Sequence, residues 1–171
     1  SKYYHGNYDN ECVYGLKDPL VEIKPFLDDI KWEYSARDYF ENDFDYQKKY
    51  IDLDLLGRIL KLKSAGYACM LATDQDKVRM DYILENYGFN IIFDHWFVSS
   101  YLNARKRDNR FWELLIKKVV EYSLMPDEIL FIDDRSENIE LANKHGIKTF
   151  HVSNEDTIKV LNHHIDSYLV K

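Results

Sequence analysis

The chain has 171 residues, of which 46% are hydrophobic and 31% charged, and its formal net charge is −7. A chain of this length can bury the core of one domain, and the negative charge argues against nucleic acid or an anionic membrane surface as the main partner. Cys12 and Cys69 fit neither a disulfide framework nor a zinc site, and no apolar stretch is long enough to span a membrane. We therefore expect a globular, cytoplasmic protein.

The region from Asp18 to Asp45 has a helical pattern. Asp18 is a candidate N-cap with Pro19 at the first helical position, and Ser35 is a second candidate N-cap. The apolar residues expected on the inner face of the first helix are Leu20, Ile23, Phe26, Leu27 and Ile30. Aromatic residues are concentrated in this front part of the chain, and we expect most of them to serve packing; they are Tyr3, Tyr4, Tyr8, Tyr14, Trp32, Tyr34, Tyr39, Phe40, Phe44, Tyr46 and Tyr50.

A longer helix is predicted from about Tyr46 to Ala65, with Gly66 as its end. The residues expected on its inner face are Leu53, Leu56, Ile59, Leu60 and Leu62. Beyond this helix, strands and helices alternate. The predicted strands are 67–73, 93–100, 128–133 and 148–153, and the predicted helices are 76–87, 108–123, 136–146 and 156–170.

This alternation predicts an α/β fold, with a Rossmann-like parallel sheet flanked by helices. In open sheets of this kind, ligands bind beyond the carboxyl ends of the strands. The predicted strands end at Thr73, Ser99-Ser100, Asp133-Asp134 and Val152-Ser153. We therefore expect the functional residues at these positions.

The third predicted strand ends in two adjacent carboxylates, Asp133 and Asp134. They would repel each other unless a cation lies between them or one is protonated. Mg²⁺ fits, because it prefers hard oxygen ligands, takes one or two carboxylates and keeps waters that a phosphate can replace. The alternative is that Asp133 ends the strand and Asp134 caps the next helix, and these residues alone leave both interpretations open.

Two further residues could bind a phosphate group. Thr73 ends its strand, and its hydroxyl could bind a phosphate oxygen together with helix N-terminal amides. Lys106 follows the second strand and could neutralise phosphate charge. Each signal is weak by itself, since threonine is a common strand residue and basic loop residues are usually solvated. The order Thr73, Lys106, Asp133-Asp134 along successive strand ends is more specific.

Four stretches, in the same order, resemble the haloacid dehalogenase-like (HAD) hydrolase superfamily, in its branch with a small helical cap. YACMLATDQ is similar to the motif that ends the second core strand, with Thr73 in the hydroxyl position. FDHWFVSSYLNARKRDNRFW resembles the third motif and places Lys106 on its lysine. ILFIDDRSENIELANKHGI is similar to the acidic fourth motif, including Asn138 and Gly146. DYFENDFDYQKKY resembles the return from cap to core.

The resemblance implies a partial helical cap over residues 1–45 and an α/β core over residues 46–171. It implies Mg²⁺ as cofactor and a small phosphorylated substrate. Asp134 would be a direct magnesium ligand, with Asp133 beside it as an indirect or alternate ligand. The residues expected to bind phosphate are Thr73, Asp74 and Lys106, and those expected to act in catalysis are Thr73, Lys106, Asp133 and Asp134.

Three residues depart from the family pattern without removing a catalytic group. Asp74 stands where the family usually has Asn, which adds a negative charge near a phosphate site. Arg107 replaces a Pro that usually follows the lysine, and Asn103 replaces a usual Gly.

The family's nucleophile, the first Asp of a DxD motif at the end of the first core strand, is not found in this chain. Residues 51–57 match the written pattern, but DYQKKY precedes them instead of a buried strand, and their leucines indicate a helix. The missing strand would lie between strands 67–73 and 128–133, which would otherwise each expose an unpaired edge. We therefore expect the functional protein to have an N-terminal segment that completes the sheet.

The leading interpretation is a Mg²⁺-dependent phosphatase that works through an aspartyl-phosphate intermediate. The alternative is a non-catalytic protein that binds phosphate or metal and lacks the nucleophile. A receiver-like or nucleotide-binding domain is a third class, but the chain has no glycine-rich phosphate loop. The sequence does not identify the substrate or the oligomeric state.

Overall fold

The computed structural model describes residues 11–169, apart from the side chains of residues 155–157 and 168. The chain divides into two compact units, and each is described by itself. The first unit holds the described part of Ser1–Leu53 together with Met70–Arg105. The second holds Asp54–Cys69 and the described part of Lys106–Lys171. The predicted aromatic residues Tyr3, Tyr4 and Tyr8 lie outside the described residues.

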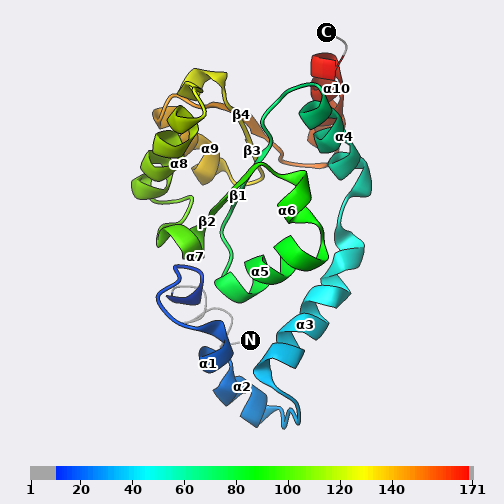
Figure 1. The fold of residues 1–171 in the computed structure, drawn as a ribbon, viewed down its shortest axis with the longest axis vertical. Helices are drawn as coiled ribbons and strands as arrows, with labels where there is room; N and C mark the ends of the chain where they lie inside the picture. The colour runs from blue at the N-terminus through cyan, green and yellow to red at the C-terminus, as the bar shows by residue number, and fades with distance from the viewer. Residues whose placement is uncertain (1–10, 170–171) are drawn as a thin grey trace. The chain divides into compact units, whose positions relative to one another are not determined.

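The first unit begins with the helices α1 (Pro19–Glu22), α2 (Lys24–Asp29) and α3 (Ala36–Gln47) (Figure 1). Both predicted caps are confirmed: Asp18 accepts a hydrogen bond from the Leu20 N–H at 2.9 Å, and Ser35 forms a capping box with Asp38. The first predicted helix is broken at Ile23. The reason is Pro25, which lacks the N–H that a continuous helix would need at that position.

The core of this unit joins α1–α3 to a later helix, α5 (Lys77–Asn86), which lies beside α3 (Figure 1). Its buried residues are Ile23, Leu27, Phe40 and Phe44, and the residues packed against them include Phe26, Trp32, Tyr39, Val78 and Tyr82. Several of the early aromatic residues therefore do serve packing. Ile30, expected inward, is 47% exposed, because the break at Ile23 ends the continuous face.

The predicted helix from Tyr46 to Ala65 is wrong in its extent. After α3 come a short 3-10 helix, η2 (Lys48–Tyr50), and an extended Ile51, and α4 runs from Leu53 to Ser64. Leu53 and Leu60 are 75% and 44% exposed, although both were expected to face inward. They lie seven positions apart on one side of α4, whereas the half-buried side includes Ile59 and Leu62.

The first unit also contains a pair of parallel strands. β1 (Met70–Thr73) pairs with β2 (His95–Val98), and Thr73 is in register with Val98. Between them lie α5 and α6 (Phe89–Ile92), and α7 (Ser99–Leu102) follows β2 directly. The last residues of the predicted second strand, Ser99 and Ser100, therefore belong to a helical turn.

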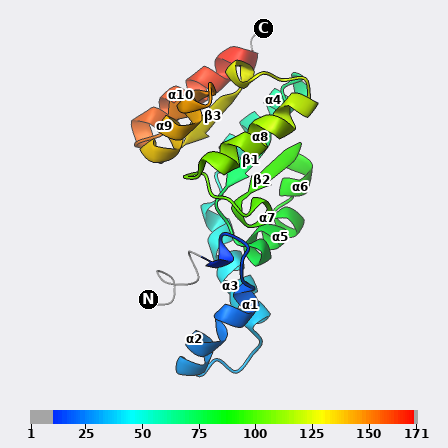
Figure 2. The same cartoon turned by 90° about the vertical axis from the view of Figure 1, so that its left-hand side faces the viewer.

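The second unit holds the other parallel pair. β3 (Leu130–Asp133) pairs with β4 (Lys148–His151), and Asp133 is in register with His151. α9 (Ser136–Lys144) packs against both strands and lies along β3 in Figure 2. The remaining elements are α8 (Asn109–Glu121), η3 (Pro126–Glu128) and α10 (Glu155–Leu169).

Large apolar residues fill the interior of the second unit. Those that are buried are Phe111, Trp112, Leu115, Val119, Phe131, Ala142, Ile147, Leu161 and Ile165. An ion pair between Arg58 and Asp166 joins α4 to α10 at the edge of this interior. α8, predicted as a helix over residues 108–123, buries Phe111, Trp112, Leu115 and Val119 on one face, because its apolar residues recur every three to four positions.

Both strand pairs are parallel, as predicted for an α/β fold. Within residues 11–169, β1 pairs only with β2 and β3 pairs only with β4. No helix in this part of the chain has both the length and the apolar surface that crossing a membrane requires.

Candidate functional site

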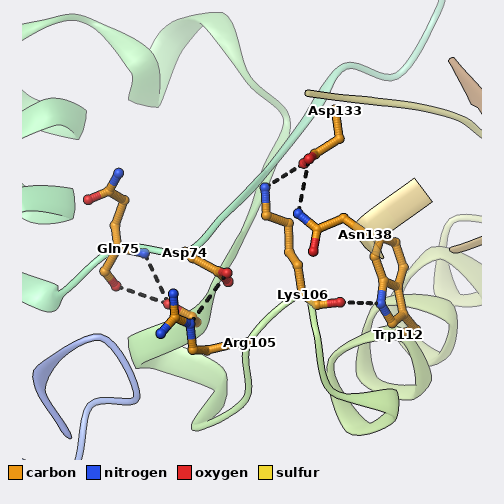
Figure 3. Close-up of polar contacts among 8 residues, drawn as sticks. Asp74, Gln75, Arg105, Lys106, Trp112, Asp133 and Asn138 are labelled. Atoms are coloured by element: carbon orange, nitrogen blue, oxygen red, sulfur yellow. Dashed lines mark hydrogen bonds and ion pairs between the residues drawn. The ribbon is translucent and has the colours of Figure 1, made fainter. Parts of the chain in front are cut away.

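Asp133, the last residue of β3, is surrounded by hydrogen-bond donors. Its Oδ2 accepts a hydrogen bond from Lys106 Nζ at 2.6 Å. Its Oδ1 accepts one from the Arg135 backbone N–H at 2.8 Å and one from Asn138 Nδ2 at 2.9 Å. Figure 3 shows the Lys106 and Asn138 side chains both pointing at this carboxylate. Because the side chain is 4% exposed, these donors replace the water that burial removes.

The charge of Asp133 is stabilised by these contacts. Burial by itself raises the pKa of this carboxyl. The hydrogen bond and the positive charge of Lys106, together with the Arg135 N–H and the Asn138 amide, outweigh burial and hold the pKa below its ordinary value. Asp133 is therefore ionised at neutral pH and keeps Lys106 oriented.

Asp134, the next residue, has the opposite environment. Its side chain is exposed, and within residues 11–169 no hydrogen-bond or ion-pair partner contacts its carboxylate. Its backbone carbonyl lies 3.1 Å from His151 Nε2, which holds the peptide next to β4. The two adjacent carboxylates thus point into different surroundings, and one of them is available to a ligand.

A free carboxylate of this kind is suited to a hard cation. Mg²⁺ is bound by one or two carboxylates, with waters and phosphate oxygens completing its shell. Within the described part of the chain, no group of three or more His, Cys, Asp or Glu side chains could hold a metal ion.

Trp112 fixes the backbone of Lys106. Its indole Nε1 donates a hydrogen bond to the Lys106 carbonyl at 2.7 Å (Figure 3). The indole is fully buried and packs edge-on against Phe131, with ring centroids 4.9 Å apart. Phe131 lies two residues before Asp133 on β3. Trp112 therefore contacts both the backbone of Lys106 and the strand that carries its carboxylate partner.

In the first unit, the loop after β1 is held by Ser99. Its hydroxyl accepts a hydrogen bond from the Gln75 N–H at 3.0 Å and donates one to the Gln75 carbonyl at 3.2 Å. Asp76 ends the loop by capping α5, accepting from the Arg79 N–H at 3.0 Å. Thr73 and Asp74 are half-buried at the start of this loop.

Asp74 lies beside Arg105. Its Oδ2 is 3.5 Å from Arg105 Nε, and the two side chains are 15% and 7% exposed (Figure 3). The Arg105 guanidinium also faces the ring of Tyr14, 5.8 Å from the ring centroid. The negative charge that Asp74 adds at this strand end therefore has a nearby, largely buried cation.

The sequence matches the family model of haloacid dehalogenase-like hydrolases over residues 17–152. This is most of the chain. The chain belongs to this family.

Solved structures of HAD proteins have the same fold at low sequence identity. One is a HAD family enzyme, BT-2542, from Bacteroides thetaiotaomicron, with 17% identity and a TM-score of 0.72 over 94% of this chain and 79% of that chain. Another is a predicted HAD-like family hydrolase from Porphyromonas gingivalis, with 17% identity and a TM-score of 0.68 over 91% of this chain and 77% of that one. No curated protein matches the sequence.

One structure of BT-2542 is a complex with ligands. It is an aspartate-to-alanine variant with magnesium and inorganic phosphate, 16% identical, with a TM-score of 0.70 over 89% of this chain and 78% of that one. These likenesses confirm the predicted α/β fold of the HAD chain.

Of the predicted site residues, the structure brings Lys106 and Asp133 into direct contact, with Asp134 next to them on the chain. Thr73 and Asp74 lie in the other unit of this HAD protein. The motif-like residues 51–57 do not end a strand, since Asp54 lies in the first turn of α4. This agrees with the prediction that they are not the nucleophile motif.

Sequence reasoning missed two residues of this region, Arg105 and Trp112. Arg105 stands among basic residues, so its pattern resembled a solvated loop. Trp112 gave no signal in the sequence, because its hydrogen bond to Lys106 depends on how the chain folds. Ser99 was indicated as a strand end, but its hydrogen bonds to Gln75, 24 residues away, were not predicted. Asn138 was indicated only through the family motif.

Proposed function

We propose that this HAD protein is a Mg²⁺-dependent phosphohydrolase that acts on a small phosphorylated molecule. The observation that carries the proposal is the exposed carboxylate of Asp134, which has no hydrogen-bond or ion-pair partner within residues 11–169 and lies beside the buried Asp133–Lys106 pair. The magnesium and phosphate complexes of BT-2542 support the same assignment by likeness.

Asp134 would bind the metal directly, and a bound Mg²⁺ would shield the charge of phosphoryl oxygens. Asp133, whose oxygens already accept hydrogen bonds, would hold Lys106 and the start of α9 in place. Lys106 and Thr73 would bind phosphoryl oxygens through an ammonium and a hydroxyl. Asp74, assigned to the same set by the family resemblance, would border the phosphate with a carboxylate that cannot donate to it, and Arg105 would compensate its charge.

The nucleophile would be an aspartate on a further strand, which would form an aspartyl-phosphate that water then hydrolyses. The unpaired edges of β1 and β3 within residues 11–169 favour such a strand, because unpaired strand edges expose backbone donors and acceptors. The division into a cap over residues 1–45 and a core over residues 46–171 belongs to this proposal. Free thiols at Cys12 and Cys69 favour a reducing, cytoplasmic compartment.

The test is turnover of phosphate monoesters, beginning with p-nitrophenyl phosphate, by the protein at its natural length. We expect activity with Mg²⁺, its loss on chelation, and a fall of about 100-fold or more in Asp134→Asn, since even indirect metal-site residues contribute 10–100-fold. Asp127→Asn, which changes an exposed carboxylate on η3, is the matched control and should keep wild-type activity. Activity that survives in Asp134→Asn would contradict the metal-binding role of this residue.

The alternative is a protein that binds phosphate or metal without turnover. Calorimetry with MgCl₂ and inorganic phosphate separates the two. Binding that Asp134→Asn abolishes, without turnover of any monoester in a broad panel, would favour the binding protein. Absence of both binding and turnover would reject both functions.

A further inference from the structure

Arg105 and Asp74 form a largely buried ion pair at the carboxyl end of β1. Arg105 Nε lies 3.5 Å from Asp74 Oδ2, and Arg105 as a whole is 6% exposed. Asp74 directly follows Thr73, the residue proposed to bind a phosphoryl oxygen. Opposite charges interact more strongly where water is largely excluded than at the surface.

We propose that Arg105 is a positioning residue that cancels the charge of Asp74, so that a phosphate group can bind at the end of β1. This inference rests on the proposed function and deepens it. It explains how the chain tolerates an aspartate at a position where an anion is expected to bind.

The need for compensation follows from the local charge. Asp76 is a second carboxylate in the same loop, and it is 3% exposed. Its side chain caps α5 by accepting from the Arg79 N–H, so it is fixed in place. A phosphate beside Thr73 would meet two carboxylates within four residues of chain. A cation next to Asp74 removes the repulsion from the nearer of them.

Arg105 is held rigidly enough for this role. The ring of Tyr14 lies 5.8 Å from its guanidinium carbon. The Tyr14 carbonyl accepts a hydrogen bond from Asn103 Nδ2 at 2.8 Å, and the Ala104 N–H donates to the Ser99 carbonyl at 3.2 Å. The backbone on the N-terminal side of Arg105 is thus fixed, and its side chain lies between a carboxylate and an aromatic ring.

The loop after β1 does not depend on the ion pair alone. Ser99 bonds both the N–H and the carbonyl of Gln75, and Asp76 caps α5. Variants at Asp74 and Arg105 should therefore keep the shape of the loop while changing its charge. This separates an electrostatic role from a purely structural one.

The experiment is calorimetric titration of the full-length protein with inorganic phosphate in the presence of Mg²⁺. Arg105→Met should weaken phosphate binding by about tenfold or more, because the positive charge beside Asp74 is removed. Asp74→Asn should bind phosphate more tightly than wild type, because Asp74 then no longer offsets the positive charge of Arg105. The double variant should return to within about threefold of wild type, and Arg105→Lys should keep most of the affinity. Equal weakening in Arg105→Met and in the double variant would overturn the proposal.

A second measurement tests the ion pair without any ligand. Thermal unfolding of the two single variants and the double variant forms a cycle. We expect the double variant to lose clearly less stability than the sum of the losses in the two single variants, since removing one partner leaves a buried charge. The same cycle at the exposed pair Arg37–Glu41, with Arg37→Met and Glu41→Gln, should be additive.

The two measurements fail in different ways. A wild-type protein that binds no phosphate would overturn the proposed function and the electrostatic role together, whereas the melting cycle would still report on the pair. If the stability losses of the Asp74 and Arg105 variants are additive, the two residues are not coupled. This result would contradict the proposed ion pair even if phosphate binds and Asp134→Asn abolishes turnover.

Discussion

Lys106 and Asp133 form a short, buried ion pair, with Nζ and Oδ2 2.6 Å apart. The lysine therefore neutralises one of the two adjacent aspartates at the end of β3. Asp134 remains the exposed carboxylate, and the repulsion that its neighbour would otherwise impose is reduced. The two aspartates thus have separate tasks: Asp133 organises the surrounding donors, and Asp134 is available to a ligand.

The first prediction concerns the pH dependence of stability. Because the pKa of Asp133 is lower in the folded state than its unfolded value of about 3.9, its contribution to stability is present above that pH and is lost as the pH falls through the folded pKa. Lys106→Met removes the main favourable contact. We expect the free energy of unfolding in urea to fall at pH 7 and to fall less at pH 3.

Lys118→Met is the control for this prediction, because Lys118 forms an equally short pair with Glu121 on an exposed helix face. It should change the free energy of unfolding only slightly at either pH, because exposed ion pairs contribute little to stability. A deficit of Lys106→Met that is the same at pH 3 and pH 7 would show that the pair with the ionised Asp133 is not its cause.

The second prediction concerns Asn138, which is 3% exposed and donates to Asp133. Asn138→Ala should lower the free energy of unfolding by about 1.5–3 kcal/mol, the range for hydrogen bonds to charged groups. It should also weaken magnesium binding by about 10-fold or more, since Asn138 holds the Asp133 side chain next to the proposed metal ligand Asp134. Asn143→Ala changes an exposed position on the same helix and should have a small effect on both stability and magnesium affinity. Urea unfolding measures the stability, and calorimetry measures the magnesium affinity.

The third prediction concerns Trp112. Trp112→Phe keeps an aromatic ring against Phe131 but removes the hydrogen bond to the Lys106 carbonyl. We expect the free energy of unfolding to fall by about 1 kcal/mol through the lost hydrogen bond, and further because the ring is smaller. We also expect weaker binding of inorganic phosphate.

Trp96→Phe serves as the comparison, because Trp96 Nε1 has only a long contact of 3.4 Å to the Phe89 carbonyl. It should lower stability without changing phosphate affinity. If both tryptophan variants alter phosphate affinity equally, Trp112 has no specific role in holding Lys106.

The fourth prediction compares two glycines. Gly15 has a φ of +72°, and a Cβ added there would lie 2.1 Å from the Ser100 carbonyl oxygen. Gly15→Ala should therefore destabilise the protein by more than about 1 kcal/mol, through both backbone strain and this clash. Gly57 lies within α4 with open space around it, so Gly57→Ala should raise stability by about 0.5–1 kcal/mol. Thermal unfolding of both variants checks the contrast, and equal effects would contradict it.

Local sequence determined the element types and most of their ends. Asp18, Ser35 and Asp76 cap helices because their short side chains reach the free N–H groups of the first turn, and this needs only a few neighbouring residues. The apolar runs before Thr73 and Asp133 also form parallel strands, as the alternation of short apolar segments with helices predicts. The strand-end pattern indicated Lys106 and Asp134, and the family motifs added Asn138.

Tertiary structure alone decided the contacts that give these residues their properties. Leucines on two sides of α4 made its buried face ambiguous, and only packing showed that Leu53 and Leu60 are exposed. The charge partner of Asp74 is 31 residues away, and the donor that holds Lys106 lies on a later helix. Sequence pattern reports periodicity and local hydrogen bonding, whereas the electrostatics of a carboxylate depend on which side chains the fold places within a few ångströms of it.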